Sequence, residues 1–162
     1  MGATLRVLAP TGEDTRAVAA AIAQALGPGD VVALTGELGA GKTTFVQGAA
    51  RALGVADPVA SPTFVLMRQY RGTLPIAHVD VYRLNRIQEV LDLGFEELLD
   101  EGWVVFVEWG DVVDALFPGS YLEVELAVGP DESREIRVTG HGPVWLARWE
   151  RLEGLLGEWR AA

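Results

Sequence analysis

The sequence contains no cysteine, and this absence excludes a disulfide framework, zinc sites built from thiolates and catalysis by a thiol. It also lacks a long apolar stretch after Arg6, near the N-terminus. Neither a signal peptide nor a membrane-spanning segment is therefore expected. We expect a soluble, cytoplasmic protein.

Positive charge is scarce as well. The chain has 13 lysine and arginine residues against 23 aspartate and glutamate residues, which gives a formal net charge of -10 at pH 7. An acidic chain repels nucleic acid backbones and anionic membranes, and no run of arginines marks a local basic patch. We therefore expect no binding to DNA or to membranes, and no binding to tRNA by the chain alone.

Lysine occurs once, at Lys42, in a stretch that matches the phosphate-binding pattern G-x-x-x-x-G-K-[ST]. Residues 31–34 before it predict a buried strand, and residues 43–53 after it predict a helix with one apolar face. The N–H groups of such a loop curl around a phosphate, and the helix N-terminus adds positive potential there. The pattern predicts a nucleoside triphosphate site rather than a glycine-rich turn without a ligand. Its residues are Gly36, Glu37, Leu38, Gly39, Ala40, Gly41, Lys42 and Thr43.

The segment before the loop predicts a strand and a helix. Residues 4–8 are typical of an edge strand, and Thr11 begins a capping box with Asp14 three residues later. The helix that follows stops at residues 27–28, and its apolar face comprises Val18, Ile22 and Leu26. Thr15 either lies by the nucleotide base or is an exposed threonine of the first helical turn, and the residues alone favour the second.

Residues 61–64, Ser-Pro-Thr-Phe, predict a rigid turn that presents two hydroxyl groups, one of them from Thr63. A loop of this kind can sense the terminal phosphate in P-loop proteins, or it can be an ordinary turn into the next strand. The residues alone favour neither interpretation. Residues 64–70 and 74–82 then predict the two strands of a hairpin.

In the second strand of this hairpin, alternation places His78 and Asp80 on one face. Such side chains are costly to bury unless they are paired or face a wet site, so we favour a nucleotide cleft over a hydrogen-bonded structural pair. The apolar strand predicted at 103–107 delivers Glu108 at its C-terminal end. Asp80 and Glu108 are both candidates for holding Mg²⁺ or its water beside the loop. Trp109 either covers the phosphates or, as is more usual for tryptophan, fills the core.

The rest of the chain completes an α/β fold. With 162 residues, 49% of them hydrophobic, the chain suffices for one well-buried domain. Residues 85–94 predict a helix with a short turn at 95–99, and residues 121–128 and 135–139 predict an antiparallel hairpin at the sheet edge. Residues 145–159 predict an amphipathic helix, either packed on the domain itself, which the residues favour, or available to a partner because of its aromatic side chains. The prediction is a three-layer P-loop NTPase-like domain, in which flanking helices cover a central mixed, mostly parallel sheet with an antiparallel hairpin.

Four motifs occur together in this chain: residues 36–44 (Gly-Glu-Leu-Gly-Ala-Gly-Lys-Thr-Thr), 61–64 (Ser-Pro-Thr-Phe), 78–83 (His-Val-Asp-Val-Tyr-Arg) and 107–109 (Val-Glu-Trp). In order and spacing they resemble TsaE, formerly YjeE, a family of small bacterial ATPases of tRNA threonylcarbamoyladenosine synthesis. The resemblance covers roughly residues 10–140 and does not extend to the tail. We therefore expect a P-loop ATPase domain over residues 1–140, and the helical spacing of the tail predicts a C-terminal amphipathic helix of the same domain over residues 141–162.

The resemblance also implies roles for single residues. Residues 39–44, which end with Thr44, would bind the phosphates of ATP, Thr43 and Glu108 would bind Mg²⁺, and Asp80 would be the Walker-B-like acid. Outside the loop the resemblance places Thr63, His78 and Trp109 around the phosphates, and Thr15 is a further nucleotide-binding candidate from its place in the sequence. The catalytic candidates are Lys42, Asp80 and Glu108. The implied partners are TsaB and TsaD, whose turnover ATP hydrolysis would support, with tRNA reached only through the complex.

Two other functions share the phosphate loop. A small-molecule or nucleoside kinase needs an acceptor site and usually arginines from a closing lid, and no arginine-rich lid segment stands out. A nucleotide-dependent scaffold would use the two acids only to hold metal. A GTPase is disfavoured because the Asn-Lys-x-Asp element for guanine is missing. Because no arginine finger is obvious either, we expect slow hydrolysis by the chain alone and activation by a partner.

Overall fold

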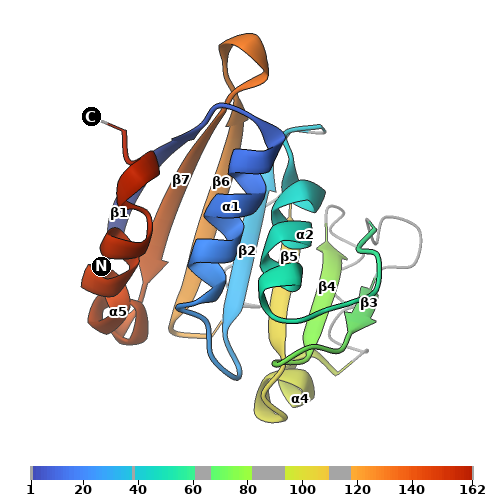
Figure 1. The fold of residues 1–162 in the computed structure, drawn as a ribbon. Helices are drawn as coiled ribbons and strands as arrows, with labels where there is room; N and C mark the ends of the chain where they lie inside the picture. The colour runs from blue at the N-terminus through green and yellow to red at the C-terminus, as the bar shows by residue number, and fades with distance from the viewer. Residues whose placement is uncertain (1, 38, 61–66, 82–93, 110–117, 162) are drawn as a thin grey trace.

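The computed structural model describes residues 2–37, 39–60, 67–81, 94–109 and 118–161. Within these ranges the chain forms a seven-stranded sheet with the strand order β1-β7-β6-β2-β5-β4-β3 (Figure 1). The predicted helix at 85–94 lies outside the described residues except for residue 94. The predicted turn at 61–64, with its two hydroxyl groups, and residues 65–66 also lie outside them. The strands are β1 (Gly2–Ala9), β2 (Val31–Gly36), β3 (Met67–Tyr70), β4 (Ile76–Val81), β5 (Val104–Trp109), β6 (Tyr121–Val128) and β7 (Arg134–His141).

The centre of the sheet is parallel and its two ends are antiparallel. Strands β6, β2, β5 and β4 run parallel to one another. At one end β3 pairs antiparallel with β4, and at the other β7 pairs antiparallel with both β6 and β1. The predicted mixed α/β sheet with flanking helices is therefore confirmed. The β3–β4 hairpin is confirmed over the residues that the structure describes.

One prediction about the sheet is wrong. The β6–β7 hairpin does not form the sheet edge, because β1 pairs antiparallel with β7 along its whole length, from Gly2 opposite His141 to Ala9 opposite Arg134. Strand β1 is the edge strand, as its sequence predicted. The hairpin is thus enclosed between β1 and β2, and its connecting turn, with the 3₁₀ helix η2 (Pro130–Glu132), rises above the phosphate-loop end of the sheet (Figure 1).

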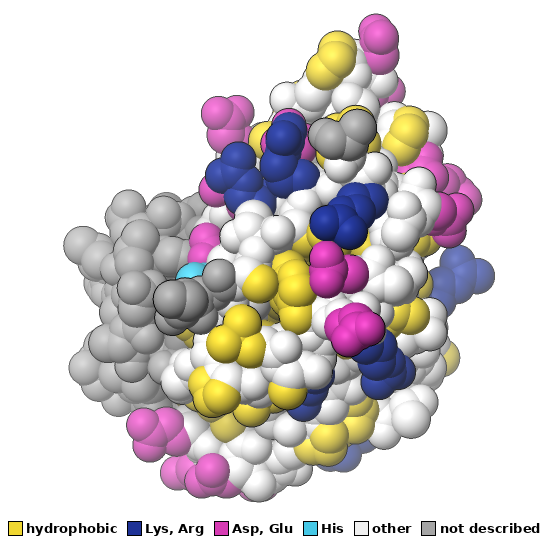
Figure 2. Space-filling model, turned by 90° about the vertical axis from the view of Figure 1, so that its left-hand side faces the viewer, with side chains coloured by type: hydrophobic (Ala, Val, Ile, Leu, Met, Phe, Trp, Pro, Cys, Tyr) yellow, Lys and Arg dark blue, Asp and Glu magenta, His cyan; other side chains and the backbone are white. Residues whose placement is uncertain are grey.

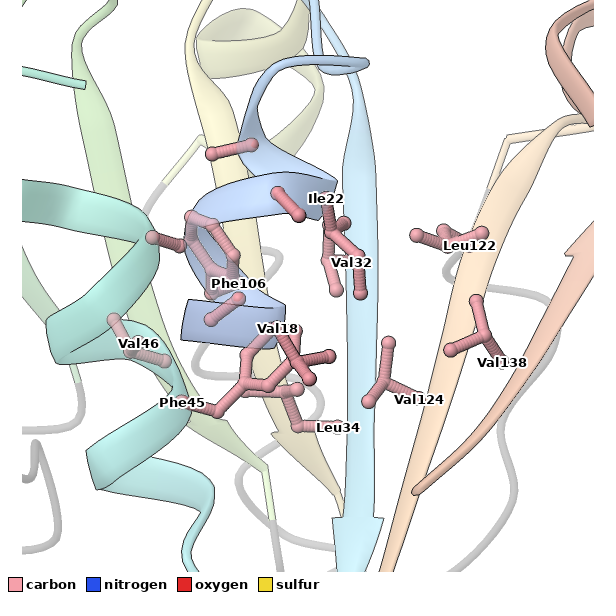
Figure 3. Close-up of a cluster of buried hydrophobic side chains, with 14 of the residues drawn as sticks. Val18, Ile22, Val32, Leu34, Phe45, Val46, Phe106, Leu122, Val124 and Val138 are labelled. Carbon is pink, nitrogen blue, oxygen red and sulfur yellow. The ribbon is translucent and has the colours of Figure 1, made fainter. Parts of the chain in front are cut away.

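One face of the sheet is covered by α1 (Gly12–Ala23), α2 (Lys42–Ala52) and α5 (Pro143–Leu155) (Figure 1). Figure 3 shows how side chains from α1 and α2 meet those from the strands. The alternating strand positions and the apolar helix faces supply this core, and ten of its members are Val18, Ile22, Val32, Leu34, Phe45, Val46, Phe106, Leu122, Val124 and Val138.

Helix α1 begins as predicted and ends earlier. The Thr11 hydroxyl accepts a hydrogen bond from the backbone N–H of Asp14 at 3.2 Å, which confirms Thr11 as the N-cap, and the same hydroxyl donates to the Asp14 carboxylate at 2.8 Å. The helix ends at Ala23, before the glycine–proline pair at residues 27–28. The chain continues in tight turns, in which the N–H of Leu26 donates to the carbonyl oxygen of Ala23. Leu26 still packs against the core from this turn.

The two helices beside the phosphate loop cross in close contact. A Cβ atom at Gly48 of α2 would lie 2.4 Å from the carbonyl oxygen of Arg16 and 2.6 Å from its Cα, both backbone atoms of α1. Only a glycine allows this approach, because no side chain can occupy that space. The crossing sets the position of α2, whose N-terminus carries Lys42.

The second face of the sheet carries a separate core. Phe95 and Leu98 of α4 (Phe95–Asp100) and the nearby Trp103 pack with the strand residues that point away from α1 and α2. Those strand residues are Val31, Ala33, Ala77, Val79, Val105 and Val107. Helices on both faces give the three-layer arrangement that the sequence predicted.

The C-terminal segment packs on the same sheet. Trp145 of α5 is 1% exposed, and Leu152 and Leu156 are fully buried in the core that holds α1 and α2. Arg148 donates to the Asp30 carboxylate at 2.6 Å and ties α5 to the turn before β2. The chain then forms η3 (Gly157–Trp159), and the N–H of Ala161 donates to the backbone carbonyl oxygen of Arg6 on β1. The amphipathic pattern thus serves packing within the chain.

The charged side chains are mixed on the side of the molecule that carries the β1 edge. Figure 2 shows arginine and acidic side chains interspersed there among apolar ones, with no broad area of one sign. None of the helices in the described ranges is long and apolar enough to cross a membrane.

Candidate functional site

The phosphate loop joins β2 to α2, as the motif predicted, and its glycines fit the curve of the chain. Gly36 has φ of +144°, and a Cβ atom there would lie 2.5 Å from the carbonyl oxygen of Leu126 on β6. Gly39 and Gly41 have φ of +83° and +106°, in the left-handed region that favours glycine. Gly41 is the N-cap of α2, so the loop leads directly into the helix N-terminus.

Lys42 lies beneath this loop. Its side-chain ammonium donates to the carbonyl oxygens of Gly36 at 2.6 Å and Glu37 at 3.0 Å, and the residue is only 7% exposed. Burial lowers the pKa of Lys42, while the nearby carboxylates of Glu108 and Asp80 act in the opposite direction. The cation is therefore held between loop carbonyls and two acids.

The two acids stand at the C-terminal ends of neighbouring parallel strands. Asp80 of β4 and Glu108 of β5 are register partners, and each is 6% exposed. Residues opposite one another in a ladder point to the same face, as do residues two apart on one strand. Phe106, two residues before Glu108 on β5, belongs to the core on the α1 and α2 side. Both carboxylates therefore face the helices that flank the phosphate loop.

His78 is bound to one of these acids. Its Nε2 lies 2.5 Å from Glu108 Oε2, and the imidazole is fully buried. The sequence left a choice between a nucleotide cleft and a structural pair, and the structure gives His78 a hydrogen-bonded partner on the next strand rather than on its own. This bond orients the Glu108 carboxylate, and contact between His78 and a nucleotide stays a prediction.

Thr15 is not the exposed threonine that its place in the first helical turn favoured. It is 1% exposed because α1 packs closely on α2, and its hydroxyl donates to the Thr11 carbonyl oxygen at 3.4 Å. Sequence reasoning missed this burial because the close crossing depends on Gly48, 33 residues away in the chain. A place beside the nucleotide base stays a prediction.

The other predicted residues divide into two groups. Thr43 and Thr44 lie in the first turn of α2 and are half-buried, next to Lys42. Leu38, Thr63 and the side chain of Trp109 lie outside the residues that the structure describes. The backbone of Trp109 is the last residue of strand β5, directly after Glu108.

Arg134 is a residue of this site that the sequence did not reveal. Its guanidinium donates to the carbonyl oxygen of Ala40 at 2.8 Å and to that of Gly39 at 3.3 Å, both in the phosphate loop. The contact joins residues 94 positions apart, and it depends on the parallel pairing of β2 with β6. Periodicity along one chain carries no signal for such a pairing.

The described residues contain no group of three or more histidine, aspartate or glutamate side chains placed to hold a metal ion. Mg²⁺ in nucleotide sites is commonly held by one or two protein oxygen ligands together with phosphates and water. The hydroxyl of Thr43 and the carboxylates of Asp80 and Glu108 are oxygen donors of that kind. This set fits a cation that arrives with a phosphate ligand better than a metal held by protein alone.

Comparisons with known proteins identify relatives over most of the chain. A family model described as "Threonylcarbamoyl adenosine biosynthesis protein TsaE" matches residues 9–136. The "tRNA threonylcarbamoyladenosine biosynthesis protein TsaE" of Bacillus subtilis is 41% identical over 131 residues, which are 80% of this chain and 82% of that protein. The protein of the same name from Treponema pallidum is 37% identical over 134 residues, which are 83% and 99% of the two chains.

A solved structure agrees with these relatives. The crystal structure of Bacillus subtilis YdiB matches with a TM-score of 0.78 and 34% sequence identity, over 98% of this chain and 97% of that one. The sequence resemblance to TsaE is thereby confirmed, and this chain belongs to the TsaE family of threonylcarbamoyladenosine biosynthesis proteins.

Proposed function

We propose that this protein binds and hydrolyses ATP as a cytoplasmic accessory subunit of tRNA threonylcarbamoyladenosine synthesis, and that its hydrolysis supports turnover of TsaB and TsaD. Family membership supports the pathway. The observation that carries the ATPase assignment is the convergence of Lys42, Asp80 and Glu108. A buried ammonium under a glycine-rich loop faces two buried carboxylates on adjacent parallel strands.

The first task of the site is to bind the triphosphate. The N–H groups of residues 39–44 and the N-terminus of α2 supply donors and positive potential for phosphate oxygens. Lys42 now donates to two loop carbonyls, and on binding it would exchange them for oxygens of the β- and γ-phosphates. Burial lowers the pKa of Lys42, and the negative charge of the incoming phosphates would act in the opposite direction.

The second task is to hold Mg²⁺ and the attacking water. Thr43 and Glu108 are the proposed metal ligands, with His78 fixing the orientation of the Glu108 carboxylate through its hydrogen bond. Bound Mg²⁺ would neutralise part of the charge that develops on the phosphates. Asp80, the register partner of Glu108, is proposed to orient a metal-bound water or the attacking water.

The third element is a partner protein. With a net charge of -10 and mixed charges on the β1-edge side, the isolated chain has little to attract tRNA (Figure 2). We propose that TsaB and TsaD bring this subunit to the tRNA pathway and raise its hydrolysis rate, either by ordering residues 61–64 or by contributing charge. Hydrolysis by the isolated chain is expected to be slow.

The test is to measure phosphate release for the protein alone, with TsaB or TsaD singly, and with both, beside a tRNA gel-shift assay. Slow release that rises only with the partners, and no tRNA shift by the isolated chain, would support the proposal. A fast rate indifferent to both partners, or tight tRNA binding by the chain alone, would contradict the accessory role. Phosphate transfer that requires an added hydroxyl acceptor would instead indicate a kinase.

A further inference from the structure

Arg134, the first residue of β7, binds the phosphate loop from outside. Two nitrogens of its guanidinium donate to the carbonyl oxygens of Gly39 and Ala40. Its third nitrogen donates to the carbonyls of Glu132 at 2.8 Å and Ser133 at 3.1 Å, in the turn that precedes β7. The planar fork thus links the β6–β7 turn to the loop, an arrangement that the single ammonium of lysine cannot reproduce.

The partners of Arg134 distinguish it from the arginines that form ion pairs. Arg6, Arg137 and Arg148 each pair with a carboxylate. Among the described residues, Arg134 instead has hydrogen bonds to carbonyl oxygens only. Its positive charge is therefore not neutralised by a described acid, and it stands beside a loop whose motif is built for phosphates.

The contacts also determine how two peptide groups of the loop are turned. In a trans peptide the N–H points away from the carbonyl, and none of the described peptides is cis. When Arg134 holds the carbonyls of Gly39 and Ala40, the N–H groups of Ala40 and Gly41 face away from the guanidinium. The N–H of Ala40 donates to the carbonyl oxygen of Glu37, which also accepts from the Lys42 ammonium. Lys42 and Arg134 therefore bind different carbonyl oxygens of the loop.

The turn that holds the guanidinium is conformationally costly. Asp131 and Glu132 both have φ in the left-handed region, at 54° and 63°, which is unfavourable for residues other than glycine. The turn is closed by hydrogen bonds from Gly129 N–H to the Ser133 carbonyl and from the Ser133 hydroxyl to the Pro130 carbonyl. In this conformation the carbonyls of Glu132 and Ser133 point at Arg134.

We propose that Arg134 is a positioning residue for phosphate binding, which fixes the peptide groups 39–40 and 40–41 of the loop and strengthens the N–H of Gly41 as a donor to phosphate, while the N–H of Ala40 closes the loop onto Glu37. A hydrogen bond to a carbonyl polarises its peptide, so the N–H of the same peptide becomes a better donor. The inference rests on the proposed nucleotide site and adds a component that the TsaE motifs quoted above do not contain. It concerns binding more than the chemical step, because the loop holds phosphate in both the ground state and the transition state.

The experiment compares Arg134→Met with Arg137→Met, an arginine of the same strand whose side chain is half exposed. We expect Arg134→Met to raise the Kd for ADP and the KM for ATP about tenfold or more, with kcat within about threefold of wild type. Arg137→Met should change none of these. In NMR spectra the amide signals of Ala40 and Gly41 should move in Arg134→Met and stay in place in Arg137→Met.

Arg134→Lys provides a second test, because it keeps the charge but cannot bridge the loop and the turn. It should bind ADP more weakly than wild type, and full recovery would show that charge alone suffices and would overturn the positioning role. Equal ADP affinity for Arg134→Met and wild type would overturn it as well.

ADP affinity also separates the two proposals, because a wild-type protein that binds ADP without hydrolysing ATP fails only the proposed ATPase activity. Wild-type protein that binds no ADP would overturn both.

Discussion

Replacing Glu108 with glutamine removes one negative charge and keeps the size of the side chain. Glu108 is 6% exposed, and its Oε2 lies 2.5 Å from Nε2 of His78. Because an amide oxygen also accepts hydrogen bonds, glutamine can keep the contact with His78. The variant should therefore fold like the wild type and differ mainly in charge.

The expected loss follows from what this charge faces. The carboxylate of Glu108 acts on the pKa of Lys42, so it lies within electrostatic reach of the phosphate loop. Removing a group that stabilises transition-state charge should lower turnover at least about 100-fold, which corresponds to about 3 kcal/mol. ATP without Mg²⁺ should bind as tightly as before or more tightly, because the variant has one fewer negative charge near the triphosphate.

The assay is single-turnover phosphate release across a Mg²⁺ titration, with the partner proteins present so that the rate is measurable. Glu125→Gln on β6 is the matched control, since this acid is half exposed and lies 3.7 Å from Arg137. The control should hydrolyse ATP at the wild-type rate. If Glu108→Gln also does so at limiting Mg²⁺, the metal role belongs elsewhere, and Asp80 is the next candidate.

Two further predictions concern stability. Gly48→Ala places a Cβ 2.4 Å from the α1 backbone, so it should lower the free energy of unfolding by about 1–3 kcal/mol, whereas Gly154→Ala, which meets no atom within 4 Å, should raise it by up to about 1 kcal/mol. Urea unfolding checks both, and equal effects would refute the close helix crossing. Burial lowers the pKa of Lys42, so between that pKa and the ordinary lysine pKa the unfolded chain holds more protons. Wild type should therefore gain stability relative to Lys42→Met as pH rises through this alkaline range, and a flat difference would contradict the burial.

Local patterns predicted much of the site. The loop, its strand and its helix follow one another in the chain, so the motif and the apolar spacing suffice to place Lys42. Strand alternation placed His78 and Asp80 on one face, and the structure has Ile76 in one core with Ala77 and Val79 in the other. Such predictions succeed because period-two and period-3.6 patterns are properties of short segments.

The features that were missed depend on contacts between distant segments. Pairing of β1 with β7 encloses the β6–β7 hairpin, and it joins residues at opposite ends of the chain. The burial of Thr15 depends on the α1–α2 crossing, and Arg134 reaches the loop only because β6 lies beside β2. The partner of His78 was also unforeseen, since alternation identifies a shared face and does not choose between side chains on neighbouring strands.

The central claim is that the loop around Lys42 binds ATP. The most direct measurement is the affinity for Mg²⁺ and ATP by calorimetry, for the wild type and for Lys42→Ala, with circular dichroism to verify that both fold. We predict binding by the wild type and loss of binding or of hydrolysis in the variant, because the ammonium that faces the phosphates is gone. Unchanged affinity and turnover in a folded Lys42→Ala variant would contradict the assignment of this loop as the nucleotide site.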